Sequence, residues 1–178
     1  MNGLLWAAVT VVGAIAIAAF GLSLAAVRRV GALQRRAALI DSFDDLPVPG
    51  DPVPADFVAG TVDGGTVSTA DLTGPDVLVL FVDGSCATCF DAVGLLQERH
   101  AAGADTVRPI AVVIGEPAER GPLVAELAPI ARVVEETSHT ALPSRFGVRG
   151  FPTALVVGGG VVRAATHRLD QIDLGVPA

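Results

Sequence analysis

The longest apolar stretch of the chain covers residues 4–27 and contains no charged side chain. Its length exceeds the roughly 20 residues that a helix needs to cross a bilayer. A cleaved signal peptide would need a basic region ahead of a shorter apolar stretch, and no basic side chain precedes this one. The pattern therefore predicts a retained membrane anchor over residues 1–29, held in the membrane by residues 4–27.

Residues 30–52 change from apolar to proline-rich and acidic. Val30, Leu33, Ala37 and Ile40 are spaced by three and four residues, which indicates either a short amphipathic helix at the membrane surface or a simple extension of the anchor helix. The prolines and aspartates that follow cannot continue a helix. We expect a juxtamembrane helix and linker here, before one folded domain that occupies residues 53–178.

The domain begins with a pattern of short apolar runs separated by turn signals. Two runs flank a Gly-Gly pair within residues 56–72 and predict a β-hairpin. Within residues 76–82, Asp76 is followed by a continuous apolar run, which is typical of a strand buried on both faces. Apolar residues then recur at helical spacing up to His100, and residues 106–115 contain a second buried strand.

The second half of the domain alternates in the same way. Residues 117–129 predict a helix, residues 131–136 a short strand, and residues 141–147 a helical turn. Residues 151–167 contain two apolar strands around three consecutive glycines, which predict an antiparallel hairpin. The tail, residues 168–178, is too short and irregular to predict a closing helix, so we expect that face of the sheet to be less covered. The fold class is therefore a mixed α/β sheet covered by helices.

Charge is divided unevenly along the chain. All 12 basic residues are arginines, and four of them directly follow the anchor, at positions 28, 29, 35 and 36. This cluster suits anionic lipid, and by the positive-inside rule alone it places the following domain in the cytoplasm. Residues 41–178 carry 8 Arg against 19 Asp and Glu, a net charge of -11. Such an acidic domain would be repelled by phosphate backbones, which excludes nucleic acid as a partner.

Cys86 and Cys89, the two cysteines of the chain, are separated by two residues and follow the first buried strand. Cys86 is expected where the next helix begins, and a thiolate there is stabilised by the helix dipole and by free backbone N–H groups. Cys89 lies one turn further along the same side of the helix. The pair therefore predicts an exposed attacking thiolate and a shielded resolving thiol, which is the arrangement for thiol–disulfide exchange.

Other interpretations of the cysteines are weaker. Two core cysteines would be unremarkable by themselves, although both fall in one turn at a predicted strand–helix junction. A zinc site needs about four ligands, and the remaining candidates are the isolated His100, His139 and His167, each expected to be a surface or satisfied residue. A peroxidase would need a Thr where Asp83 stands. A tethered copper- or zinc-binding assembly factor that uses the two thiols as ligands remains the alternative.

A second motif lies at residues 146–153, "FGVRGFPT", and together with the cysteine pair it resembles the thioredoxin superfamily. The resemblance implies a thioredoxin-like mixed sheet flanked by helices, with an N-terminal β-hairpin extension and a preceding transmembrane helix. It also implies that Pro152 is a cis-proline that packs against the two sulfurs. The implied substrate-facing residues are Ser85, Ala87, Thr88, Phe151 and Thr153.

Two longer stretches narrow the resemblance. Residues 50–82 look like the start of the membrane-anchored TlpA-like and redoxin-like branch, and residues 4–36 are similar to the anchor of the MauD-like methylamine-utilisation accessory proteins. This implies a single-pass membrane protein whose catalytic domain is extracytoplasmic, against the simple charge count. It further implies protein thiols or disulfides as substrates, a membrane redox partner, and no cofactor beyond the Cys86–Cys89 dithiol.

The chain also departs from these families around the dithiol. Leu80 and Ala92 stand where relatives carry an acid that helps to move the proton of the resolving thiol. Asp83 and Asp91 are nearby, but each is expected to be a solvated residue or a helix-start charge. The sequence therefore assigns no proton shuttle, and the dipeptide between the cysteines does not fix the direction of electron flow.

Overall fold

A computed structural model describes residues 46–103 and 107–172 of the chain. The chain divides into two compact units, residues 1–43 and 44–178, and the second unit is described below. The predicted anchor, residues 1–29, and most of the predicted linker lie outside the described residues. Within the described ranges, no helix combines the length and the apolar character needed to cross a membrane.

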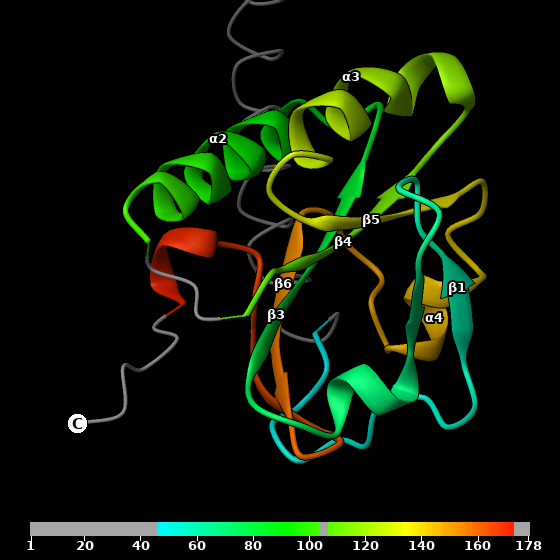
Figure 1. Ribbon diagram of the computed structural model, residues 1–178, viewed down its shortest axis with the longest axis vertical. Coiled ribbons are helices and arrows are strands. Elements are labelled where there is room, and N and C mark those ends of the chain that lie inside the picture. The colour runs from blue at the N-terminus through cyan, green and yellow to red at the C-terminus, as the bar shows by residue number, and fades with distance from the viewer. Residues whose placement is uncertain (1–45, 104–106, 173–178) are drawn as a thin grey trace, which may run out of the picture. The chain divides into compact units, whose positions relative to one another are not determined.

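The centre of the domain is a five-stranded sheet with the order β5-β4-β3-β6-β7 (Figure 1). β3 pairs with β4 and β4 pairs with β5 in parallel, whereas β6 and β7 run antiparallel to their neighbours. The strands are β3 (Val77–Asp83), β4 (Ile110–Ile114), β5 (Arg132–Glu136), β6 (Thr153–Gly158) and β7 (Val161–Thr166). The predicted mixed α/β sheet, with the first buried strand at its centre, is confirmed.

Both faces of the sheet are covered. Side chains alternate along β3, so successive residues point to opposite faces. Leu78, Leu80 and Val82 point into one core, which is closed by α2 (Ala87–Ala101), α3 (Pro117–Leu127) and the 3-10 turn η2 (Leu169–Gln171). Val77 and Phe81 point into the other core, which is closed by α4 (Leu142–Arg145) and by the N-terminal hairpin. Each residue of β3 is consequently buried.

The tail of the chain covers more of the sheet than its sequence predicts. It forms no long helix, but η2 buries Leu169 to 2% exposure and is followed by Ile172 at 5%. Both side chains pack in the core that contains α2. Arg99 of α2 also donates a hydrogen bond to the carbonyl of Ile172 at 3.1 Å. The expectation of a less covered face is therefore wrong, because Leu169 and Ile172 close it without a long helix.

The predicted N-terminal hairpin is confirmed as a separate two-stranded sheet formed by β1 (Val58–Gly60) and β2 (Thr66–Ser68). Beyond β1, the backbone N–H of Val62 donates to the carbonyl of Val133 in β5 at 2.9 Å. This contact covers part of the outer edge of β5, an edge that would otherwise offer unpaired backbone groups to another chain.

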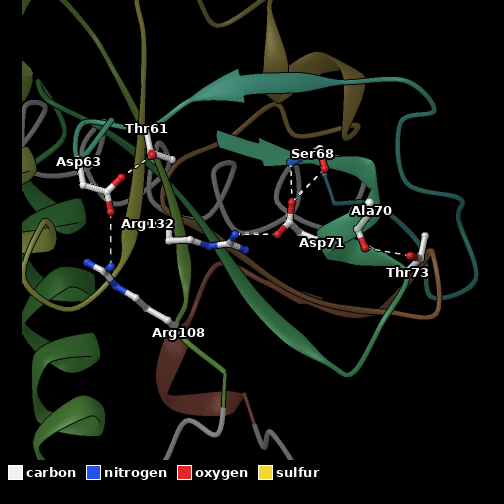
Figure 2. Close-up of polar contacts among 8 residues, drawn as sticks. All are labelled: Thr61, Asp63, Ser68, Ala70, Asp71, Thr73, Arg108 and Arg132. Atoms are coloured by element: carbon white, nitrogen blue, oxygen red, sulfur yellow. Dashed lines mark hydrogen bonds and ion pairs between the residues drawn. The ribbon is translucent and has the colours of Figure 1, made fainter. Parts of the chain in front are cut away.

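Polar side chains hold the hairpin against the sheet, as Figure 2 shows. Asp71, in the 3-10 turn η1 (Thr69–Leu72), pairs with Arg132 of β5 at 2.7 Å and also accepts two hydrogen bonds from Ser68. The hydrogen bond from Arg132 is the main reason why the pKa of Asp71 lies below its usual value. A longer ion pair, Arg108 to Asp63 at 3.5 Å, joins the hairpin turn to the chain before β4.

Gly84, in the loop that joins β3 to α2, provides a test of the packing. A Cβ at this position would stand 2.6 Å from the backbone carbon of Glu119 in α3, and backbone cannot move aside cheaply. We expect Gly84→Ala to lower the free energy of unfolding by about 1–3 kcal/mol, the usual cost of overpacking. Gly74→Ala, where a Cβ meets nothing within 4 Å, is the matched control. Equal unfolding midpoints in denaturant for the two variants would contradict the close approach.

Candidate functional site

The loop between β3 and α2 is organised by Asp83, the last residue of β3. Its Oδ1 accepts hydrogen bonds from the backbone N–H of Ser85 at 2.8 Å and from the Ser85 hydroxyl at 2.5 Å. Its carbonyl accepts the N–H of Cys86 at 3.1 Å. Asp, Gly and Ser favour such turns because their side chains or backbone freedom satisfy the chain locally. The sequence "DGSC" thus turns the chain from the central strand directly into α2.

Cys86 is the N-cap residue of α2 and is partly exposed. Its Sγ lies 3.1 Å from the Thr88 hydroxyl and 3.7 Å from the carbonyl oxygen of Phe151, to which it can donate a hydrogen bond. The first turn of α2 contains no acidic residue. Negative charge on Cys86 would therefore face the positive end of the helix dipole without a competing carboxylate in that turn.

Cys89, one turn into α2, has an exposed fraction of 0% and belongs to the main core. Its Sγ accepts a hydrogen bond from the backbone N–H of Asp83 at 3.4 Å. Burial is the main reason why the pKa of this thiol lies far above its ordinary value. The hydrogen bond from the Asp83 N–H opposes that increase, whereas Cys86 and, to a smaller extent, the charge of Asp83 add to it. Both cysteines are free thiols. The site therefore combines one accessible thiol with one shielded thiol.

The Phe151–Pro152 peptide bond is cis, as the resemblance implies. His167 holds the next part of this loop, because its Nδ1 lies 2.8 Å from the Pro152 carbonyl and 3.1 Å from the Thr153 hydroxyl. The hydroxyl of Thr153 donates to the Gly150 carbonyl at 2.7 Å, and the Pro152 carbonyl can only accept. The Nδ1 of His167 must therefore carry a hydrogen.

The residues predicted to face a substrate differ in exposure. Ser85, Ala87 and Thr88 are exposed, and Phe151 is partly exposed beside Cys86. Thr153 has an exposed fraction of 0%, and its hydroxyl is used inside the protein. The side chain of Thr153, the first residue of β6, therefore points into the protein.

Asp83 and His139 form a pair that the sequence does not reveal. Asp83 is 6% exposed, so the expectation that it is a solvated residue is wrong. Asp91 is exposed, as predicted. The Nε2 of His139 lies 2.5 Å from Asp83 Oδ2, and its ring centroid is 5.3 Å from that of Phe151. In the sequence, the only feature that points to Asp83 as a site residue is its position at the end of an apolar strand. No sequence feature points to His139, which is remote from Asp83 along the chain.

The electrostatics of Asp83 favour the charged carboxylate. Burial acts to raise the pKa of Asp83, but hydrogen bonds from Ser85 and His139 outweigh that effect and hold the pKa below its usual value. The carboxylate therefore stays ionised at neutral pH, in a nearly buried position beside the dithiol.

The described residues offer no ready site for a metal ion. Within residues 46–103 and 107–172, no group of three or more His, Cys, Asp or Glu side chains is placed to hold one. The described structure thus gives no observation in favour of the zinc or copper alternative.

Comparison with solved structures identifies the fold as thioredoxin-like. The thioredoxin domain of a thiol-disulfide oxidoreductase from Bacteroides vulgatus is 19% identical, with a TM-score of 0.57, over 70% of this chain and 92% of that chain. A thiol:disulfide interchange protein from Bacteroides sp. is 23% identical, with a TM-score of 0.56, over 69% and 84%.

A secreted disulfide oxidoreductase from Mycobacterium tuberculosis is also similar, at 16% identity and a TM-score of 0.53, over 63% of this chain and 83% of that chain. No protein-family model and no curated protein matches the sequence. At these identities the shared feature is the fold.

The raised pKa of Cys89 predicts a loss of stability in alkali. Above the ordinary thiol pKa of about 8.5, the unfolded chain loses this proton while the folded protein keeps it. The free energy of unfolding of the reduced protein should then fall with a slope approaching about 1.4 kcal/mol per pH unit. Denaturant titrations at a series of pH values measure that slope.

The chain suits this measurement because it contains no lysine and no tyrosine, whose titration would overlap that of a thiol. Cys89→Ala is the control, and it should remove the slope while keeping the Cys86 thiol. Parallel profiles for the reduced protein and the Cys89→Ala variant would contradict the buried, protonated state of Cys89.

Proposed function

We propose that this protein is a membrane-tethered thiol–disulfide oxidoreductase that exchanges disulfides with protein substrates through Cys86 and Cys89. The observation that carries the proposal is the asymmetry of the two thiols in one helical turn. Cys86 is accessible at the start of α2 and lies against the carbonyl of Phe151, whereas Cys89 is buried behind it. The names of the structurally similar proteins, which are thiol–disulfide oxidoreductases and interchange proteins, support the same reaction class.

In the reducing direction, the Cys86 thiolate attacks one sulfur of a substrate disulfide, and the other substrate sulfur leaves as a thiolate that takes up a proton. The Cys89 thiol then loses its proton and attacks Sγ of Cys86. The second substrate sulfur leaves and is protonated in turn. The substrate disulfide is thereby reduced to two thiols, the dithiol is oxidised to a Cys86–Cys89 disulfide, and the oxidising direction is the reverse.

The exposed groups around Cys86 suit an extended protein segment as substrate. Ser85, just before α2, and Ala87 and Thr88, in its first turn, are exposed, and Phe151 and Pro152 are partly exposed on the facing loop. None of the five carries a charge, so the proposed contact surface favours backbone and apolar contacts over an ionic substrate. The cis peptide bond at Pro152 belongs to the same surface.

The location proposed for the enzyme is the membrane, with residues 1–29 as a single-pass anchor and the catalytic domain on the extracytoplasmic side. The uncharged residues 4–27 support the anchor, and the likeness of residues 4–36 to MauD-like anchors supports the orientation. Disulfide exchange is needed most outside the cytoplasm. A membrane redox partner would then restore the dithiol after each turnover.

Trapping of intermediates tests the reaction. In a Cys89→Ser variant, the mixed disulfide on Cys86 cannot be resolved, so substrate proteins should accumulate as adducts that are released by reducing agent. The adducts are measured on non-reducing gels and identified by mass spectrometry. Cys86→Ser is the matched control and should form none. Absence of adducts on Cys89→Ser, together with ordinary thiol reactivity of Cys86, would contradict the proposal.

Labelling in intact cells tests the orientation. Cys89 is fully buried, so a membrane-impermeant maleimide added to the reduced protein should report on Cys86. An extracytoplasmic domain predicts modification before lysis, at a level close to that reached after lysis. Modification only after lysis would place the domain in the cytoplasm and change the pool of substrates. Cys86→Ser in the same cells gives the background.

A further inference from the structure

The resolving step of the proposed reaction lacks an obvious base. Cys89 is buried, and its proton must leave before its sulfur can attack. Leu80 and Ala92, which occupy the positions where related enzymes carry an acid, are apolar and buried. The proton must therefore leave by another route.

The backbone N–H of Asp83 donates a hydrogen bond to the Cys89 sulfur at 3.4 Å, which places Asp83 next to the buried thiol. The negative charge of its carboxylate also raises the pKa of the Cys89 thiol. On its other side, Oδ2 of the same carboxylate meets Nε2 of His139 at 2.5 Å. Asp83 therefore links the buried sulfur to a histidine on the β5–α4 connection.

His139 reaches the surface from this position. Its side chain is 60% exposed, so its ring exchanges protons with water, and its packing against Phe151 keeps it beside the dithiol. Because the Asp83 carboxylate stays ionised, a proton accepted by the pair rests on the imidazole. A carboxylate that orients a histidine and stabilises its protonated form is a well-established way to make a base.

We propose that the Asp83–His139 pair is the proton acceptor for Cys89 in the resolving step. The inference rests on the proposed function and assigns a proton acceptor to its resolving step. The proton of the Cys89 thiol passes to the pair, which then holds it as carboxylate and imidazolium, and the imidazolium releases it to solvent. At the same time the Cys89 sulfur forms its bond to Sγ of Cys86, and the bond between Cys86 and the substrate sulfur breaks.

A purely structural role for the pair is the competing explanation. Asp83 also orders the turn at Ser85, and His139 could simply complete its hydrogen bonds. The two explanations differ for His139→Gln. A glutamine amide can still donate a hydrogen bond to Asp83, but it cannot accept a proton as imidazole does.

The experiment follows the reaction of the full-length reduced protein with 5,5′-dithiobis(2-nitrobenzoate), which releases a coloured thiolate in each of two steps. The first equivalent reports the attack by Cys86, and the second reports resolution by Cys89. The coloured thiolate leaves without taking up a proton. The rate of the second phase therefore depends on how readily the Cys89 thiol loses its proton. We expect His139→Gln and Asp83→Asn to slow the second phase by about 100-fold, the lower end of general base catalysis.

Chemical rescue makes the test specific for proton transfer. Imidazole added to His139→Ala should restore much of the second phase, in proportion to its concentration. His100→Gln, which changes an exposed histidine of α2, is the matched control and should behave as the parent protein.

A second phase of normal rate in His139→Gln, or no response of His139→Ala to imidazole, would overturn the role of the pair. These results remain distinct from failure of the proposed function, in which the parent protein itself would show no paired release of two equivalents. Folding of each variant is checked separately by its unfolding midpoint in denaturant, because an unfolded chain would also expose Cys86 to the reagent.

Discussion

The burial of β3 on both faces is the constraint on which the rest of the structure depends. Its seven residues are enclosed by α2, α3 and η2 on one side and by α4 and the N-terminal hairpin on the other. Because the strand is held in this way, the position of its carboxyl end, at Asp83, is well defined. The short turn after it therefore delivers Cys86 to the start of α2 at the surface and leaves Cys89 in the core. The difference between the two thiols is a consequence of packing, and the proposed chemistry uses that difference.

The same strand end connects the two cysteines to the rest of the site. Antiparallel pairing of β3 with β6 brings the cis peptide of Phe151 and Pro152 next to Cys86, although more than 60 positions separate them in sequence. Asp83 makes three contacts. Its carboxylate binds Ser85 in the turn and His139, and its backbone N–H donates to the Cys89 sulfur. A residue with so many contacts at the edge of the core can influence both stability and proton transfer.

The sequence predicts the fold well, because its apolar periodicity is strong. The continuous apolar run before the cysteines and the Gly-Gly hairpin both correspond to observed elements. It predicts less of the site, because contacts such as Asp83 with His139, and Pro152 with His167, join segments whose pairing depends on tertiary structure. The burial of the Thr153 side chain is also not evident from the sequence, since one position of register decides whether a strand residue faces solvent or core.

Equilibration with glutathione tests most directly whether Cys86 and Cys89 form one redox couple. The protein is held in buffers of different glutathione ratio, and its free thiols are then alkylated and counted by mass. The proposed function predicts that both cysteines become protected together, in one two-electron transition within the range of about -270 to -120 mV that known dithiol enzymes span. Separate protection of the two cysteines, or glutathione adducts on Cys86 without an internal disulfide, would contradict it.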